Sequence, residues 1–293
     1  MSNEVWQIGS IRVTLVREAL VPIPPAGLFP DADTAPVIDA NRSWLAPHFL
    51  TDDGTFPLSI HAFVVQADGR TMVVDSCIGD RPVPGHEAMS NIGDGWLRSF
   101  AAAGFDPATV DLVLCTHLHF DHVGWNTRLV DGAWVPTFPH ARYLFGRHEY
   151  EHWATGADGY AMTFTDAVQA VVDAGLADLV DTDHVVSESV CLESTPGHSP
   201  GHVSIHLRSG DEHAVITGDM LHHPVQIAAV DWRMGADYDS VEATATRRRF
   251  FAANADTSTQ IFGTHFAPPT RGWIRSDGDG YRFDVQPSAD EPS

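Results

Sequence analysis

Short apolar runs separated by turn residues recur along the chain and predict a fold rich in β-strands. Residues 60–66 and 70–76 flank Ala67-Asp68-Gly69 and predict a hairpin. Further strands are predicted at residues 4–20, 110–115, 141–145, 185–192, 203–207, 214–217 and 260–265. A helical periodicity predicts helices at residues 95–103, 149–153, 163–179 and 240–253. Strands thus come in two groups, each followed by helix, which favours two packed sheets with helices outside.

Residues 21–57 interrupt this pattern with Pro, Asp and Ala and with isolated aromatic side chains. We expect an irregular segment that acts as a lid, because it has neither strand nor helix periodicity. Trp44, Phe49 and Phe56 are its expected contributions to the apolar wall of a substrate pocket. Residues 1–286, this segment included, are expected to fold as a single α/β domain, and the polar tail 287–293 to be disordered.

The charge balance narrows the range of partners. The chain has 39 acidic and 17 basic residues, a formal net charge of −22, which disfavours nucleic acid and anionic membranes. No apolar stretch is long enough for a membrane span, and the N-terminus lacks a secretory-signal pattern. The basic run 247–249 is expected to be a solvated helix face. The three cysteines lie in or beside apolar runs and fit buried free thiols in a cytoplasmic protein: Cys77, Cys115 and Cys191.

A metal-ligand cluster follows the apolar run at 110–115. Residues 116–122, with the sequence THLHFDH, carry His117, His119, Asp121 and His122. Imidazole and carboxylate groups are the usual ligands of zinc and related divalent ions. A chance run of surface histidines is disfavoured, because the cluster follows a buried-strand pattern and is not part of a polar low-complexity tract. The pattern indicates a metal site at the edge of a sheet.

Three later segments carry the same ligand types. A loop rich in Gly and Pro holds His198, the strand at 214–217 leads to Asp219, and the strand from 260 leads to His265. Each residue alone would more often be an ordinary polar side chain, but their joint placement after the cluster overturns that interpretation. In this order they resemble the metallo-β-lactamase superfamily, whose signature is HxHxDH followed by His, Asp and His. The resemblance covers roughly residues 58–285.

The resemblance implies a fold and a metal centre. The fold is an αββα sandwich of two mixed β-sheets flanked by helices. The centre holds two divalent ions, expected to be Zn²⁺, about 3.5–4 Å apart and sharing a hydroxide nucleophile. The implied ligands are His117, His119 and His198 for one ion, Asp121, His122 and His265 for the other, and Asp219 as the bridge. Asp121 and Asp219 are the implied catalytic carboxylates, and Asp121 can pass the proton to the leaving group.

Several neighbouring residues have more than one interpretation. Asp75 resembles the acidic residue that orients a ligating imidazole in this family, and His202 either supports the ligands or belongs to a turn. Thr116 and Thr264 are expected to hold the backbone. For Trp153 core packing is favoured over substrate contact. Further candidates for substrate contact are Trp125, Met220, His222 and His223, with helix-start or surface positions as the alternative for the two histidines.

Features outside the signature select one branch of the superfamily. Antibiotic-degrading β-lactamases carry Cys or Ser in place of Asp219, and flavodiiron proteins carry Glu in place of His119. The acidic charge disfavours the nucleic-acid branches. Residues 145–153, with the sequence FGRHEYEHW, and the C-terminal segment resemble N-acyl homoserine lactonases and methyl parathion hydrolase. The resemblance departs at His222, where some homoserine lactonases have a substrate-contacting tyrosine.

We therefore expect a cytoplasmic binuclear metallohydrolase that opens a lactone or cleaves a carboxylic ester of a small molecule. One alternative is a phosphotriesterase or phosphodiesterase at the same site. A second is a mononuclear-iron thiol dioxygenase in which the second set of ligands stays empty, and a third is a metal-binding protein without turnover. Neutral, apolar substrates are expected, because Arg147 is the one basic residue near the motifs. A homodimer is a candidate assembly.

Overall fold

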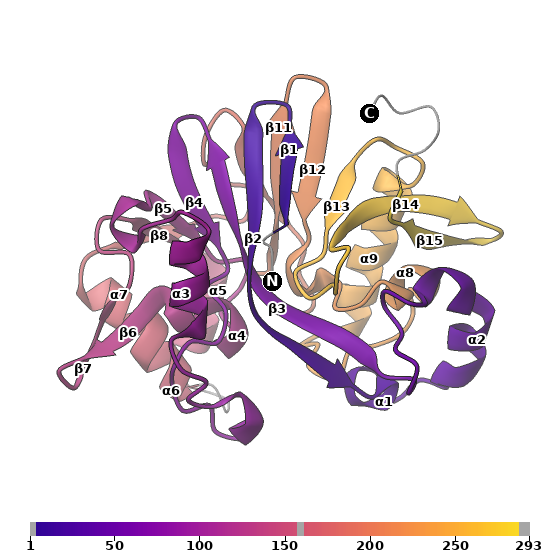
Figure 1. The fold of residues 1–293 in the computed structure, drawn as a ribbon, viewed down its shortest axis with the longest axis horizontal. Coiled ribbons are helices and arrows are strands. Elements are labelled where there is room, and N and C mark those ends of the chain that lie inside the picture. Colours follow the sequence, from indigo (N-terminus) through magenta and orange to yellow (C-terminus); the bar gives the residue numbers. More distant parts are fainter. Residues whose placement is uncertain (1–3, 157–160, 287–293) are drawn as a thin grey trace.

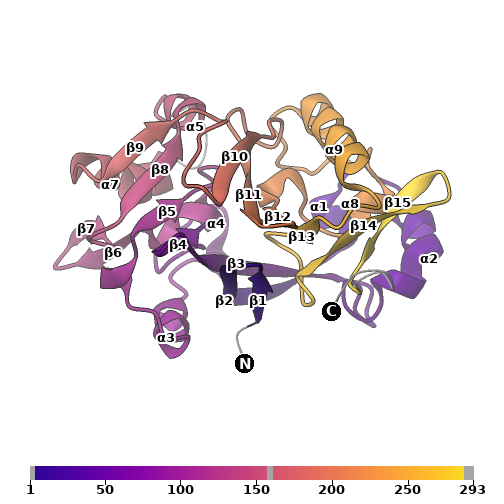
Figure 2. The ribbon, with the colours of Figure 1, turned by 90° about the horizontal axis from the view of Figure 1, so that it is seen from above.

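Two β-sheets lie face to face, and helices cover their outer surfaces (Figures 1 and 2). This arrangement is seen in a computed structural model that describes residues 4–156 and 161–286. The predicted αββα sandwich of two mixed sheets is therefore confirmed. The tail 287–293 lies outside the described residues. No helix in the described ranges is both long and apolar enough to cross a membrane.

The first sheet has seven strands, in the order β1-β2-β3-β4-β5-β8-β9. Strands β1 to β4 pair antiparallel, whereas β4, β5, β8 and β9 are parallel. Their bounds are β1 (Val5–Ile8), β2 (Ile11–Ile23), β3 (Phe56–Ala67), β4 (Arg70–Val74), β5 (Leu112–Leu114), β8 (Arg142–Gly146) and β9 (Ala177–Val180). A separate hairpin joins β6 (Thr127–Val130) to β7 (Ala133–Pro136).

The second sheet has six strands in sequence order, and its one parallel pair is β12 with β13. Its strands are β10 (Val190–Ser194), β11 (Val203–Ser209), β12 (Glu212–Ile216), β13 (Gln260–Phe262), β14 (Arg271–Asp277) and β15 (Gly280–Asp284). Parallel strands need a crossover, and α9 (Ser240–Asn254) lies in the connection from β12 to β13.

Alternating side chains explain why the sheets stack. In β3, Phe63 and Val65 point into the core between the sheets, while Ala62 and Val64 point to the helices on the other side. Residues of β11 do the same, with Ile205 in the inter-sheet core. Both faces of β3 are buried, so its apolar run is nearly continuous, whereas β11 alternates apolar residues that face the core with polar residues that face outward.

Helices pack on each outer face. Those on the first sheet are α3 (Gly95–Ala102), α5 (Arg147–Trp153), α6 (Ala161–Thr163), a π-helical turn (Phe164–Gln169) and α7 (Ala170–Asp173). Those on the second sheet are α1 (Pro25–Leu28), α2 (Thr34–Leu45), α8 (Val225–Ala228) and α9. The short α4 (Phe120–Val123) lies within the metal-ligand cluster.

The structure corrects the expectation for residues 21–57. This segment contains the end of β2, both α1 and α2, and the start of β3. Its prolines suggested a loop, but Pro25 and Pro36 lie in the first turns of the two helices, where a missing N–H is tolerated. Ile38 and Leu45 then bury one face of α2.

Three other element predictions needed adjustment. The run at 4–20 is a hairpin, because Gly9 takes the positive φ of 53° that its turn needs. The helical pattern at 163–179 ends at Asp173, and β9 follows. In the run 185–192, β10 begins at Val190. The bounds of both strands are set by pairing, of β9 with β8 and of β10 with β11, which the local pattern cannot reveal.

Candidate functional site

The loops that follow three strands, together with the loop between β10 and β11, converge at one end of the sandwich. The turn after β5 and α4 carry His117, His119, Asp121 and His122. His198 lies between β10 and β11, Asp219 follows β12, and His265 follows β13. We call these seven residues the candidate ligands. The structure brings all seven together, as predicted from their order in the sequence.

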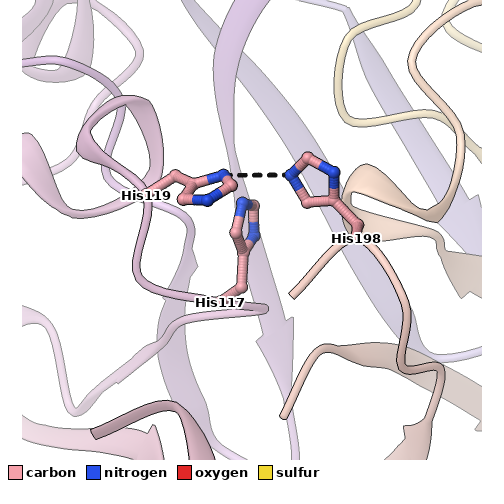
Figure 3. Close-up of side chains that lie close together, drawn as sticks. All are labelled: His117, His119 and His198. Atoms are coloured by element: carbon pink, nitrogen blue, oxygen red, sulfur yellow. Dashed lines mark hydrogen bonds between the residues drawn. The ribbon is translucent and has the colours of Figure 1, made fainter. Parts of the chain in front are cut away.

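Three imidazoles form the first group. Potential ligand atoms of His117, His119 and His198 lie within 4.8 Å of one another. The rings point toward a common centre in Figure 3, and His198 Nε2 lies 3.0 Å from His119 Nδ1. All three side chains are buried. Three convergent, buried imidazoles are a ligand set typical of a divalent metal.

The second group contains a carboxylate and two imidazoles. Asp121, His122 and His265 also place ligand atoms within 4.8 Å of one another. His122 Nε2 lies 3.7 Å from Asp121 Oδ1, and His265 Nε2 lies 3.5 Å from Asp121 Oδ2. Asp219 lies between the groups, since its Oδ2 is 3.5 Å from His198 Nε2 and 3.3 Å from His122 Nε2.

These residues fit divalent cations. His117 Nε2, His122 Nε2 and Asp219 Oδ1 are buried and accept or donate no hydrogen bond within the described part of the chain. A buried polar atom without a partner is unfavourable, and a cation would satisfy all three. Oxygen and imidazole donors without thiolate suit zinc and similar ions. The arrangement is consistent with a two-metal site.

Charge in the site favours the metal-binding forms of His117 and Asp219. Burial, and then the charge of His122, hold the pKa of His117 well below its usual range, so this imidazole is neutral. Burial raises the pKa of Asp219, but the charges of His122, His265 and His222 outweigh it and hold that pKa well below its usual value. Metals bind neutral imidazole and ionised carboxylate. For His122 and His265, burial lowers the pKa but the charges of Asp219 and Asp121 outweigh it and raise the pKa, so these two imidazoles would lose a proton on binding a metal.

Asp75 anchors the loop after β5. Its Oδ1 accepts a hydrogen bond from the Thr116 N–H at 2.8 Å, and its Oδ2 accepts from the Thr116 hydroxyl at 2.8 Å. His122 Nδ1 lies 3.0 Å from the same Oδ2, so the other ring nitrogen is free to face the site. The backbone of Asp75 has a φ of 51°, a strained conformation that Asp tolerates better than most residues.

His202 supports Asp219 through its backbone. Burial lowers the pKa of His202 to about 3, so the ring is neutral. Its Nε2 accepts a hydrogen bond from the Asp219 N–H at 2.8 Å, which leaves the proton on Nδ1, 2.8 Å from the Thr195 hydroxyl. Of the two interpretations of His202, support for the ligands is the one that this geometry favours.

Sequence reasoning missed two carboxylates. Buried Glu149 in α5 accepts hydrogen bonds from Leu118 N–H at 3.3 Å and Gly201 N–H at 2.7 Å, so it ties the His119 loop to the His198 loop. Asp237 Oδ1 lies 3.2 Å from His198 Nδ1. No pattern in the sequence marked Asp237 or Glu149: the residues that begin α5, Arg147 and His148, are exposed, and Glu149 is the first buried position of the helix.

A contact with Asp237 also shows that the prediction for the basic run 247–249, a solvated helix face, was wrong for Arg247. Arg247 is fully buried and its Nη1 lies 3.5 Å from Asp237 Oδ2. It is therefore not part of a solvated face, unlike the exposed Arg248, which pairs with Asp231.

A cavity of about 210 Å³ opens onto the candidate ligands. Part of its wall is made of His119, Asp121, His198, Asp219, His222 and His265. The rest is mostly apolar: Ile23, Gly27, Leu28, Leu58, Ile60, Met89, Phe120, Met234 and Ala236, with His86. Residues 21–57 thus do reach the site, through Ile23 and α1. No arginine lines the cavity among the residues that the structure describes, and the chain has no lysine.

Of the predicted substrate contacts, His222 alone lines this cavity. Its Nε2 lies 3.0 Å from Asp219 Oδ2, and its Nδ1 has no hydrogen-bond partner within the described residues. His198, Asp219 and His222 form another group of potential ligands.

The structure places the other predicted contacts elsewhere, because they fill the core. Phe49, Phe56 and Met220 are buried between the second sheet and its helices, and Trp44 packs against the same cluster. His223 stacks on Phe56 and its Nε2 is 2.8 Å from the Phe49 carbonyl. Trp125 donates a hydrogen bond to Glu18 in the core beside α3.

Comparison with known proteins identifies the family. The profile of the metallo-beta-lactamase superfamily matches residues 55–265. The chain belongs to the metallo-beta-lactamase superfamily. Its members with solved structures include the hydrolase AbOPH, which is 25% identical, covers 98% of both chains and has a TM-score of 0.81. The dizinc quorum-quenching lactonase AidC, solved with a product N-acyl homoserine, is 18% identical over 97% of both chains, with a TM-score of 0.78.

Similarity to curated superfamily members is partial. The N-acyl homoserine lactonase AttM of Azorhizobium caulinodans is 31% identical over 121 residues, which is 39% of this chain and 42% of that lactonase. The probable metallo-hydrolase YybB of Bacillus subtilis strain 168 is 24% identical over 191 residues, 63% of this chain and 75% of the relative. The present chain therefore spans less than half the length of the N-acyl homoserine lactonases that it matches.

Proposed function

We propose that this protein is a metal-dependent hydrolase that opens a lactone, or cleaves a carboxylic ester, of a neutral and apolar substrate. The observation that carries the proposal is the apolar cavity whose end wall is formed by candidate ligands. Substrate sites are typically apolar with a few polar groups that fix orientation. The similarity to N-acyl homoserine lactonases supports the ester or lactone class.

In this proposal His117, His119 and His198 hold one divalent ion, expected to be Zn²⁺, and Asp121, His122 and His265 hold a second. Asp219, with an oxygen near each group, would be the ligand that the two ions share. Bound divalent ions supply an activated water and polarise a carbonyl oxygen.

The chain's own groups position and move the proton. Asp121 lines the cavity and keeps about a sixth of its side chain exposed, at 17%. Its carboxylate takes up the proton of the attacking water and delivers it to the leaving oxygen. His222, which lines the cavity beside Asp219, helps to orient the substrate. The wall formed by Leu28, Met89 and Met234 binds the acyl part and excludes water.

The test combines metal analysis with a substrate panel. Protein purified without chelator should contain two equivalents of metal, and one equivalent of iron would instead favour a dioxygenase. The panel comprises a neutral lactone, an aryl ester, a phosphotriester and a carboxylate-bearing ester of similar size. We expect the highest kcat/KM for the neutral lactone or ester, because no arginine among the described residues of the cavity wall is placed to hold an anion.

Asp219→Ala should lose most of the second metal, because a bridging carboxylate screens two cations held close together. A clear preference for the anionic ester, or full metal content in Asp219→Ala, contradicts the proposal.

A further inference from the structure

A second, larger cavity is lined by residues of β10, β11, β12 and α9. Figure 2 shows these elements, with α9 on the outer face of the six-stranded sheet. The volume of the cavity is about 470 Å³. It exists because α9 covers only part of the sheet. Phe250 and Phe251 of α9 pack on Val215 and Ile261 of β12 and β13, whereas the core cluster on this face includes no described residue of β10 or β11. The outward side chains of these two strands therefore line a groove beside the helix.

The lining is cationic, in a protein whose net charge is −22. Arg208 of β11 and Arg249 of α9 both reach this cavity, and within the described chain no carboxylate oxygen lies within 4 Å of either guanidinium. Their neighbour Arg248 lies outside the cavity and pairs with Asp231 at 2.6 Å. Two arginines without an acidic partner thus face the same space.

The one carboxylate in the lining is already engaged. Glu193 Oε2 lies 2.5 Å from His206 Nε2, and His206 Nδ1 lies 2.8 Å from His213 Nε2. The hydrogen bond from His206, and then the charges of His206, Arg249 and Arg208, outweigh burial and lower the pKa of Glu193. Both guanidinium groups are thus close enough to Glu193 to act on it, but neither is neutralised by direct contact.

We propose that this cavity binds a small organic anion. Its carboxylate or phosphate group lies against Arg208 and Arg249, because a guanidinium matches the geometry of an oxyanion with two parallel hydrogen bonds. Its apolar part lies on Phe250 and Ala253, which also line the cavity. This site is separate from the candidate ligands and does not depend on the function proposed for them.

Calorimetry on the metal-loaded full chain tests this site, with hexanoate and hexyl phosphate as probes at constant ionic strength. We expect saturable binding of at least one probe, and the one that binds identifies the head group. Affinity should fall at least about ten-fold in both Arg208→Gln and Arg249→Gln, which corresponds to about 1.4 kcal/mol. Arg248→Gln is the matched control and should bind like the unchanged protein, because its side chain lies outside the cavity.

Two results overturn the proposal. One is the absence of saturable binding for both probes. The other is binding that persists unchanged in Arg208→Gln and Arg249→Gln, which would place the anion elsewhere, such as at the metal centre. Arg249 is exposed on α9, so its variant decides the matter even if Arg208→Gln, within a strand, fails to fold.

Discussion

Glu149 shows how one buried side chain can position a whole site. Its carboxylate accepts three N–H groups: Leu118 and Gly201 from the ligand loops, and Trp153 Nε1 at 2.7 Å. Two oxygens can accept three donors, but a single amide oxygen cannot satisfy all of them, and an amide NH₂ would face a donor. Glu149 therefore acts on metal binding through the backbone of both loops and contacts no ligand atom itself.

We predict that Glu149→Gln weakens metal binding by about 10- to 100-fold, the range typical of groups that orient ligands. Competition with a chromogenic chelator measures the affinity. Glu151→Gln, an exposed position on the same helix, is the control and should leave the affinity unchanged. Equal affinities for the two variants would refute a positioning role for Glu149.

At this scale the sequence was informative where chemistry and spacing coincide. His117, His119, Asp121 and His122 stand out because four residues of metal-ligand type fall within six positions after an apolar run. Asp237 could not be predicted, since its role depends on a contact with His198 and on buried Arg247, and neither contact leaves a local pattern.

Buried histidines outside the site make stability depend on pH. Burial lowers the pKa of His223 to about 3. The unfolded chain, with a histidine pKa of about 6.5, binds more protons than the native state below that pH. The contribution to stability is therefore fully present above about pH 6.5 and is lost as the pH falls towards 3, by about 2 kcal/mol at about pH 5.

We predict that His223→Gln reduces this acid sensitivity. Urea unfolding of metal-free protein at about pH 7.5 and about pH 5 should show a loss of stability about 2 kcal/mol smaller in the variant than in the unchanged protein. His48→Gln, at an exposed position in the same region, should keep the full pH dependence. The prediction fails if His223→Gln and His48→Gln respond to pH alike.

The segment between β2 and β3 contributes some side chains to the core and others to the wall of the cavity. Phe49 follows α2 and lies fully buried against the second sheet, whereas Leu28 of α1 lines the cavity. A segment rich in Pro and Asp was expected to be a loose lid. Its helices were not predictable, because their apolar positions are few and become meaningful only against the outer face of a sheet assembled from distant strands.

We predict that two truncations in this segment affect different properties, stability in one case and substrate binding in the other. Phe49→Ala should lower the free energy of unfolding by about 3–5 kcal/mol, as typical for a buried aromatic, with little change in KM. Leu28→Ala should raise KM for an apolar ester and destabilise less, because its side chain borders open space. Denaturant unfolding and steady-state kinetics on both variants separate the roles. If Phe49→Ala raised KM more than Leu28→Ala does, Phe49 would line the substrate pocket after all, and the role assigned to it in the core would be wrong.

For the molecule as a whole, the site joins the two sheets. The loop after β5 comes from the first sheet, while His198, Asp219 and His265 come from the second. The two-layer arrangement was predictable, since strands came in two groups. The strand order was not, because pairings such as β5 with β8 join segments that no local pattern relates.

We predict that metal removal destabilises the entire fold. A ligand that binds only the native state, at 100 times its Kd, contributes about 2.7 kcal/mol per site. A chelator should therefore lower the thermal midpoint in one cooperative transition, and added zinc should restore it. Asp219→Ala should respond much less. Identical melting curves for metal-loaded and verified metal-free protein would contradict this link.

The division of the ligands between the sheets also sets an order of events in biosynthesis. Proteins are made from the N-terminus, and N-terminal parts can fold first. The turn after β5 would emerge with His117 to His122 already in place, but the proposed first position still lacks His198 and the second still lacks His265. The first position needs the chain as far as His198, which follows β10, and the second needs it as far as His265, which follows β13. We therefore expect metal to be loaded only after synthesis of the second sheet has begun, and a nascent chain stalled between the two sheets to remain metal-poor.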